Sequence, residues 1–427
     1  MKTVETTEYK LEKNNGSYRF RFKLKNPQLQ RFFDLEQKEI EYFNGWQNKG
    51  MLEYVESKIE NIKHQIGFES ITVIDNELIV KFQNLTNSFV ENICDAIRDF
   101  YEQREMHVTR MFGSYILLMK ENGILKAKKA TEIPIKYCPL MVKLLNEVGG
   151  DNANSLLQTL KTENIELQKK NMCNLINDVV ISGGYFDTNR PLNSCEANVL
   201  FGASETMSSA LESGIIDCAV IVSNNLGTII TTNSSNTQGA VKRMTGLFFS
   251  SPSKKLVQTA INSKIIPVFP YTANIDQLEG VKQAIKLGYK KIAVSVASHD
   301  NFLHKSIKLL ENDQIKIYKF GLCSTGIKSE TAQIMKNYAD VVWSCASKYV
   351  KEYIQPNSIA QVGIKIPVHI MTNRGFEIIT NHLKHIDSTF AVDQNIKNPI
   401  FFNSNGKIQT ISKDNLKKCT DCPHPCI

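Results

Sequence analysis

The chain has 427 residues, of which 42% are hydrophobic and 22% charged, as in a folded globular protein with more than one domain. No apolar run reaches the length of about 18 residues that a membrane helix needs, and the first residues are polar. We therefore expect no membrane span and no export, and we place the protein in the cytoplasm. The net charge of +8 is dispersed along the chain, so nucleic acid is an unfavoured partner.

The cysteine content is high for such a chain. Ten cysteines without an export signal indicate free thiols or metal ligands rather than disulfides. Three of them lie in the last nine residues.

The first part of the chain, residues 1–105, has the pattern of a small α/β accessory module. We expect a strand at residues 17–25 and a helix at residues 35–66. Two short strands then follow at residues 70–82, with a hinge at residues 75–76. An amphipathic helix then places four apolar side chains on one face, Phe89, Ile93, Ile97 and Phe100. The module has no catalytic motif, and it is a candidate for binding a protein partner.

A core follows at residues 106–385. It begins with a hairpin at residues 111–129, because Glu121, Asn122 and Gly123 supply the turn. Helical sequence then extends to about residue 170, and residues 178–192 have the composition of a surface loop with a short strand at 179–181.

From residue 218 strands and helices alternate. The expected strands are at residues 218–222, 227–232, 265–269, 292–296, 315–320, 341–344 and 364–371. The second of these is the hairpin partner of the first. Expected helices lie at residues 200–213, 253–262, 301–311, 329–338, 347–354 and 373–384.

Residues 274–297 give the clearest pattern. Asp276 and Glu279 have the spacing of a helix cap, an apolar stripe follows, and Gly288 ends the helix. An apolar strand comes directly after it, which makes half of a βαβ unit. We therefore predict an α/β protein with a doubly wound, mostly parallel (Rossmann-like) sheet, an extra N-terminal module and a cysteine-rich tail at residues 386–427.

Several segments of the core resemble the methanogenesis marker protein 8 family, an uncharacterised family whose genes accompany methane metabolism. These segments are KYCPLM (136–141), LFGASETMSSALESGIID (200–217), IDQLEGVKQAIKLGYKKIAVSVAS (275–298), STGIKSETA (324–332), SCASKYVKE (344–352) and QVGIKIPVHIMT (361–372). The resemblance implies an anaerobic setting but no established reaction. The chain departs from the family at residues 223–225, where Ser-Asn-Asn replaces a Cys-Asp-Gly turn.

The tail carries a Cys-x2-Cys-x3-Cys spacing formed by Cys419, Cys422 and Cys426, which lets three thiolates converge on one ion. With His424 or a remote cysteine the site would suit zinc, and with cysteines alone an iron-sulfur cluster. We favour iron-sulfur because the resemblance implies anaerobiosis. Three further cysteines match family positions and are candidate metal ligands, Cys138, Cys173 and Cys345. Their alternative role is that of small buried apolar side chains.

Loops at the carboxyl ends of parallel strands form a ligand-binding rim in doubly wound sheets. In this chain these loops are rich in hydroxyls, glycine and helix starts, which suit a small anionic ligand. The candidate ligand-binding residues are Arg243, Ser298, Ser324, Thr325, Gly326, Ser347, Lys348 and Arg374. Capping of helices is the alternative role for Asp300 and Ser347.

The sequence has few candidates for catalysis. Cys345 with His299 or His369 would be a nucleophile and base pair, and Asp300 is a further candidate. We expect the other histidines, including His107 and His304, to lie mostly at the surface.

Three functional hypotheses follow. In the first, an anaerobic accessory protein binds, assembles or matures a metal- or sulfur-containing cofactor. In the second, an enzyme acts on a small phosphorylated or carboxylated metabolite at the rim. In the third, residues 1–105 make the chain a non-catalytic binding module.

Overall fold

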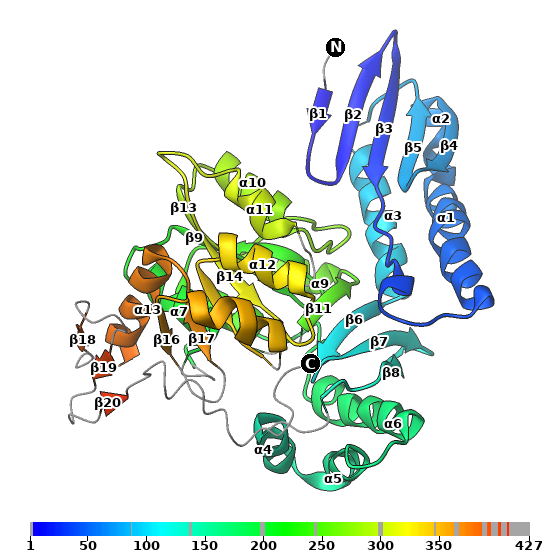
Figure 1. Cartoon of the computed structure of the whole chain (residues 1–427). Helices are drawn as coiled ribbons and strands as arrows, with labels where there is room; N and C mark the ends of the chain where they lie inside the picture. The colour runs from blue at the N-terminus through cyan, green and yellow to red at the C-terminus, as the bar shows by residue number, and fades with distance from the viewer. Residues whose placement is uncertain are drawn as a thin grey trace.

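The computed structural model describes residues 3–86, 88–135, 139–196, 201–242, 246–297, 302–345, 347–362 and 367–386, and three short strands after them (Figure 1). Its described residues form a mixed α/β protein with several sheets. Among these residues, no helix is both long enough and apolar enough to span a bilayer.

The N-terminal residues form a 5-stranded antiparallel sheet. Its strands in spatial order are β1 (Thr3–Glu5), β2 (Tyr9–Asn14), β3 (Ser17–Lys23), β5 (Glu77–Phe82) and β4 (Phe68–Ile74). Asn15 and Gly16, like Asp75 and Asn76, have positive φ, as tight hairpin turns require. The predicted strand at 17–25 and the hinge at 75–76 are therefore confirmed.

Two helices cover one face of this sheet, α1 (Gln37–Ile59) and α3 (Phe89–Gln103). The four apolar side chains predicted on one face of α3 are all fully buried. Short helical segments connect the larger elements, namely η1 (Leu29–Arg31), η2 (Glu60–Ile62) and α2 (Lys63–Ile66).

The second sheet has the order β11-β6-β7-β8 and combines distant segments. Its strands are β6 (Met106–Met111), β7 (Ser114–Glu121), β8 (Ile124–Ala130) and β11 (Gly246–Ser250). The hairpin predicted across Asn122 and Gly123 is confirmed, and both turn residues have positive φ. Strand β11 comes from a later part of the core, and its pairing with β6 completes this sheet.

A helical layer packs on the second sheet and contains α4 (Pro139–Val148), α5 (Gly150–Thr159), α6 (Ile165–Leu175) and the π-helix η3 (Ile176–Ile181). The prediction of a short strand at 179–181 is therefore wrong. Ile176 and Val180 are buried in the apolar cluster between this helical layer and the second sheet. This packing stabilises helical structure in a segment that also contains Asn and Asp.

The central sheet has 8 strands in the order β12-β10-β9-β13-β14-β15-β17-β16. Their bounds in chain order are β9 (Cys218–Ser223), β10 (Gly227–Thr231), β12 (Ile266–Pro267), β13 (Lys291–Ala297), β14 (Lys316–Leu322), β15 (Val341–Trp343), β16 (Ala360–Val362) and β17 (Val368–Ile370). Strands β9, β13, β14 and β15 are parallel, whereas every pairing outside them is antiparallel.

The sheet is thus mixed rather than mostly parallel, and this part of the prediction is wrong. Its four parallel strands also lie in chain order, without the reversal that creates a ligand-binding crevice in doubly wound sheets. The predicted Rossmann-like, doubly wound arrangement is therefore not confirmed.

Helices cover both faces of the central sheet (Figure 1). One face packs against α10 (Gln277–Lys286), α11 (Leu303–Lys308), α12 (Ser329–Tyr338) and the π-helix η4 (Val350–Ile354). The other face packs against α7 (Ala203–Glu212), α8 (Ser234–Val241), α9 (Lys254–Asn262) and α13 (Asn373–Ile386). The remaining elements are η5 (Gln355–Asn357), β18 (Ala391–Asp393), β19 (Ile400–Phe402) and β20 (Ile408–Gln409).

The segment at 274–297 has the predicted form. The Asp276 side chain accepts a hydrogen bond from the Glu279 N–H at 2.9 Å, and Gly288 has a φ of 94°. Gly280 lies against the sheet so closely that an added Cβ would meet the side chains of Thr228 and Val220 at 2.7 Å. Helix α10 therefore packs on β9 and β10 through a position where glycine is required.

Buried polar contacts attach the N-terminal sheet to the rest of the protein. The Glu8 carboxylate accepts hydrogen bonds from the Tyr271 N–H at 3.0 Å and from the N–H and hydroxyl of Thr272 at 2.9 and 2.6 Å. The Lys25 amine donates to the Ser250 carbonyl. Burial raises the pKa of Glu8 to about 7, against the lowering effect of these hydrogen bonds.

Candidate functional site

Two cysteines follow neighbouring parallel strands. Cys323 comes directly after β14, and Cys345 comes two residues after the end of β15. Gly321 and Val342 are partners in the parallel register, so both strands end at the same edge of the sheet. The structure thereby brings together two thiols that are 22 residues apart in the sequence.

Ser324 ties the two strand ends together. Its hydroxyl donates to the Trp343 carbonyl at 2.9 Å and accepts from the Cys345 N–H at 2.8 Å. The side chain is fully buried. Ser324 therefore holds the backbone of Cys345 in place, and Thr325 adds a hydrogen bond to the Cys345 thiol.

Arg110, from β6 of the second sheet, brings a positive charge to these cysteines. Its guanidinium donates to the Thr325 carbonyl at 2.7 Å, to the Gly113 carbonyl at 3.2 Å and to the Cys323 carbonyl at 3.4 Å. The guanidinium also lies 5.0 Å from the ring centre of Tyr115. We call Arg110, Cys323, Ser324, Thr325, Gly326 and Cys345 the thiol edge.

The protonation of the two thiols depends on burial and on Arg110. Burial, together with the charge of the Cys345 thiolate, raises the pKa of Cys323 to about 11, against the lowering effect of Arg110. Surrounding protein atoms also raise the pKa of Cys345, although this residue is exposed, while Thr325 and Arg110 lower it. Both groups are therefore neutral thiols at pH 7, and a thiophilic metal ion would displace their protons on binding.

The segment after β15 adds two predicted residues to the same side of the sheet. The Ser347 hydroxyl accepts from the Val350 N–H at 3.3 Å, which is the capping role considered as its alternative. Lys348 is exposed, and its amine lies 4.9 Å from the ring centre of Tyr349.

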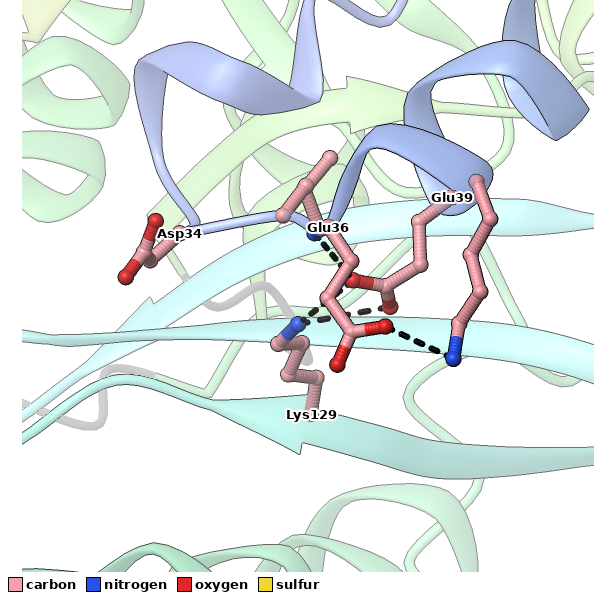
Figure 2. Close-up of a pocket in the computed structure, with 6 residues that line it drawn as sticks. Asp34, Glu36, Glu39 and Lys129 are labelled. Atoms are coloured by element: carbon pink, nitrogen blue, oxygen red, sulfur yellow. Dashed lines mark hydrogen bonds and ion pairs between the residues drawn. The ribbon is translucent and has the colours of Figure 1, made fainter.

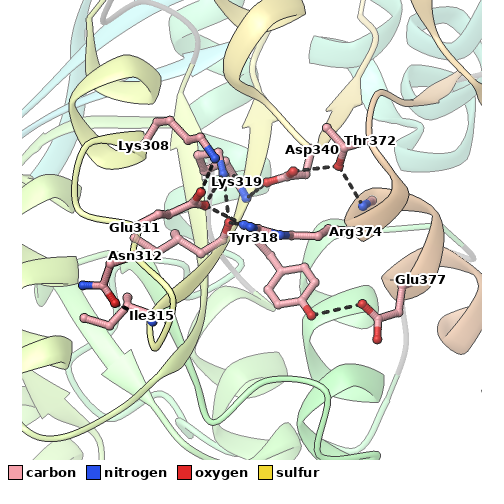
Figure 3. Close-up of polar contacts among 12 residues, drawn as sticks. Lys308, Glu311, Asn312, Ile315, Tyr318, Lys319, Asp340, Thr372, Arg374 and Glu377 are labelled. Atoms are coloured by element: carbon pink, nitrogen blue, oxygen red, sulfur yellow. Dashed lines mark hydrogen bonds and ion pairs between the residues drawn. The ribbon is translucent and has the colours of Figure 1, made fainter.

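Arg374 lies elsewhere. Strand β17 runs antiparallel to β15, so its carboxyl end, and with it Arg374, is at the opposite edge of the sheet. The prediction that this loop shares one rim with the others is therefore wrong. The sequence of a short apolar strand does not indicate the direction in which the strand runs. The Arg374 guanidinium binds the Glu311 carboxylate at 2.7 Å, within a buried network around Lys319 (Figure 3).

Cys173 also has different surroundings. It lies on α6 and packs against the apolar cluster between the helical layer and β7–β8. Burial raises its pKa to about 11. Among the residues that the structure describes, no three His, Cys, Asp or Glu side chains form a group that could hold a metal ion.

The remaining predicted site residues lie outside the described residues. They are Cys138, Arg243, Ser298, His299, Asp300, Cys419, Cys422 and Cys426. The pairing of Cys345 with His299 therefore stays a prediction. His369 is 2% exposed in β17, and burial lowers its pKa to about 4, so it is neutral at physiological pH.

A second polar cluster was not anticipated from the sequence. The His107 ring contacts the Glu105 carboxylate and the Ser250 hydroxyl, each at 3.0 Å, and the Asn225 N–H donates to the same hydroxyl at 2.8 Å. The expectation of a surface position for His107 is wrong, because this ring is fully buried. The cluster has the composition of a catalytic triad, but its serine is only 1% exposed to solvent. His304 is likewise buried.

A shallow hollow lies where α1 begins, next to β8 (Figure 2). It is lined by Asp34, Leu35, Glu36, Lys38, Glu39 and Lys129. Glu39 accepts from the Glu36 N–H at 2.9 Å and pairs with Lys129 at 3.2 Å, so its carboxylate serves the helix cap and an ion pair. We assign no ligand to this hollow.

Sequence reasoning missed the roles of Cys323 and Arg110. Cys323 was detectable in principle, because a cysteine follows each of two successive predicted strands. Arg110 was not, since its contact with Thr325 joins residues that are 215 positions apart.

Comparisons with known proteins place this core in a family. Residues 107–384 match the family described as an uncharacterized protein conserved in archaea (DUF2099). The chain is also 35% identical over 294 residues to an uncharacterized protein, MJ0054, of Methanocaldococcus jannaschii. That match covers 68% of this chain and 95% of the relative. The chain therefore belongs to this uncharacterised archaeal family.

Proposed function

We propose that this protein binds a thiophilic metal ion or a metal-sulfur cofactor at the thiol edge, and acts as an accessory protein that carries, assembles or matures that cofactor. The observation that carries the proposal is the meeting of Cys323 and Cys345 at the ends of adjacent parallel strands, with Arg110 beside them. Thiolates are the ligands that soft metals and iron-sulfur clusters select.

The electrostatics of the edge favour this ligand class. Burial raises the pKa of both thiols, and the charge of Cys345 adds to the rise at Cys323, so two thiolates without a cation are unfavourable here. A bound cation would remove the repulsion, and Arg110 would balance the negative charge that a metal-thiolate unit carries.

Two ligands do not complete a zinc or iron-sulfur site, so further thiolates are needed. The tail cysteines Cys419, Cys422 and Cys426 have a suitable spacing, and Cys138 is another candidate. We favour an iron-sulfur cluster over zinc because the core resembles methanogenesis marker protein 8, whose setting is anaerobic.

The test is anaerobic purification of the full chain followed by iron, sulfide and zinc analysis. We expect bound metal in the wild type and a loss of most of it in a Cys323→Ser/Cys345→Ser variant. Cys195→Ser is the matched control, because this cysteine is exposed and lies outside the thiol edge. A triple Ser variant of the tail cysteines shows whether they supply the remaining ligands. Equal metal content in the wild type and the Cys323/Cys345 variant would contradict the proposal.

A further inference from the structure

The spacing of two strand ends suits a covalent bond between Cys323 and Cys345. Gly321 of β14 and Val342 of β15 are register partners. The cysteines follow these partners by two and by three residues, so they are offset by one residue along the strands. Adjacent strands are about 4.8 Å apart and one residue advances a strand by about 3.3 Å, so this offset puts the two α-carbons about 6 Å apart. Disulfides join α-carbons that are about 4.4 to 6.8 Å apart.

Hydrogen bonds hold the two strand ends together beyond their last paired residues. The Ser344 N–H donates to the Pro367 carbonyl at 2.8 Å, which continues the pairing of β15 with β17. The Ser324 hydroxyl bonds the Trp343 carbonyl and the Cys345 N–H, as described above. The backbone next to each cysteine is therefore fixed to a neighbouring strand.

Both thiols are near the second sheet. A Cβ added to Gly246 of β11 would lie 3.6 Å from the Cys323 sulfur. The Arg110 guanidinium lowers the pKa of Cys323 and that of Cys345. The charge of the Cys345 thiolate also acts on Cys323, so the two sulfurs are close enough to interact.

We propose that Cys323 and Cys345 form a reversible disulfide by exchange with a low-molecular-weight disulfide. The thiolate of one cysteine attacks the small disulfide and releases one small thiol, and the second cysteine then attacks the mixed disulfide and releases the other. The protein loses two electrons and two protons, and the small disulfide gains both. Cys345 attacks first, because it is exposed whereas Cys323 is half-buried.

The disulfide removes the two thiolates that a metal ion at the thiol edge would need. Oxidation and metal binding therefore exclude each other, and this competition rests on the function proposed above. The surroundings favour the bond once it has formed. A dithiol stays reduced most readily where the protein stabilises a thiolate, whereas burial raises the pKa of both thiols here.

The test treats the metal-free full chain with an excess of oxidised glutathione, blocks the remaining thiols with iodoacetamide and digests the chain with trypsin. Cleavage after lysine puts the two cysteines on separate peptides, residues 320–328 and 337–348, each with a single cysteine. We expect these peptides to be joined, lighter than the two free peptides together by two hydrogen atoms, and to separate in dithiothreitol. Cys345→Ser should lose the joined peptide, and the control Cys195→Ser should keep it, because that cysteine is exposed and lies outside the thiol edge.

Three results would overturn the proposal: no joined peptide from the wild type, a more abundant bond of either cysteine to a different cysteine, or an end state with glutathione on Cys345. Saturation with zinc before the oxidant is added should slow the joining about tenfold or more, because the metal occupies the thiolates. An unchanged rate would overturn the competition. A chain that forms the joined peptide but binds no metal would contradict the proposed function and leave the disulfide in place.

Discussion

The buried lysine of β14 offers the sharpest test of how the central sheet is held together. Lys319 is 2% exposed, and its amine contacts the Glu311 carboxylate at 2.7 Å and the Asp340 carboxylate at 2.9 Å. These carboxylates are 6% and 5% exposed (Figure 3). Replacing the lysine by methionine keeps the length of the side chain but leaves two buried carboxylates without this cation.

Removal of one partner from a buried ion pair costs about 3 to 5 kcal/mol. The lower end applies here, because each carboxylate keeps other partners. Arg374 and Lys308 still contact Glu311, and the Thr372 hydroxyl still donates to Asp340. We therefore expect Lys319→Met to lower the free energy of unfolding by about 3 kcal/mol.

The measurement is urea denaturation followed by tryptophan fluorescence in a Trp46→Phe background, so that Trp343 of β15 reports on the central sheet. The control is Lys316→Met, since Lys316 is exposed on the same strand and a surface change of this kind stays within about 0.5 kcal/mol. A loss below about 1 kcal/mol, or an equal loss in the two variants, would refute the reasoning, because the network would then contribute no more than exposed ion pairs do.

Two further predictions concern packing and pH. Gly280→Ala should destabilise the protein by about 1 to 3 kcal/mol, because the new methyl group overlaps side chains of β9 and β10 and outweighs the helix preference of alanine; unchanged urea stability would contradict this packing. Glu8 has a pKa of about 7 in the folded protein against 4.5 in a free chain, so its contribution to stability is complete below pH 4.5 and is lost as the pH rises through 7. The side chain of the Glu8→Gln variant is neutral at every pH. The free energy of unfolding of this variant, relative to that of the wild type, should therefore rise by up to about 3 kcal/mol between pH 5 and pH 8. If the difference between the two free energies does not change with pH, Glu8 is ionised in the folded protein.

Local signals in the sequence were sufficient where a few adjacent residues determine the structure. The Asn122–Gly123 turn and the cap at Asp276 are of this kind, since each depends on contacts within four residues. The buried face of α3 follows from a helical period over a single segment.

Features that depend on distant pairing were beyond the sequence. The antiparallel direction of β17 depends on its partner strand, and β11 completes a sheet whose other strands precede it by more than a hundred residues. The same limit applies to the candidate site. Cys323 and Cys345 could be placed on one edge only if β14 and β15 were known neighbours, and Arg110 arrives from a different sheet.

The central claim is that Cys323 and Cys345 are metal ligands, and X-ray absorption at the edge of the bound metal tests it most directly. For anaerobically purified full chain, we predict sulfur scatterers at about 2.3 Å, the distance of metal-thiolate bonds, and a lower sulfur count or no metal in Cys323→Ser/Cys345→Ser. A spectrum with only nitrogen and oxygen scatterers, or one that the double substitution leaves unchanged, would contradict the account.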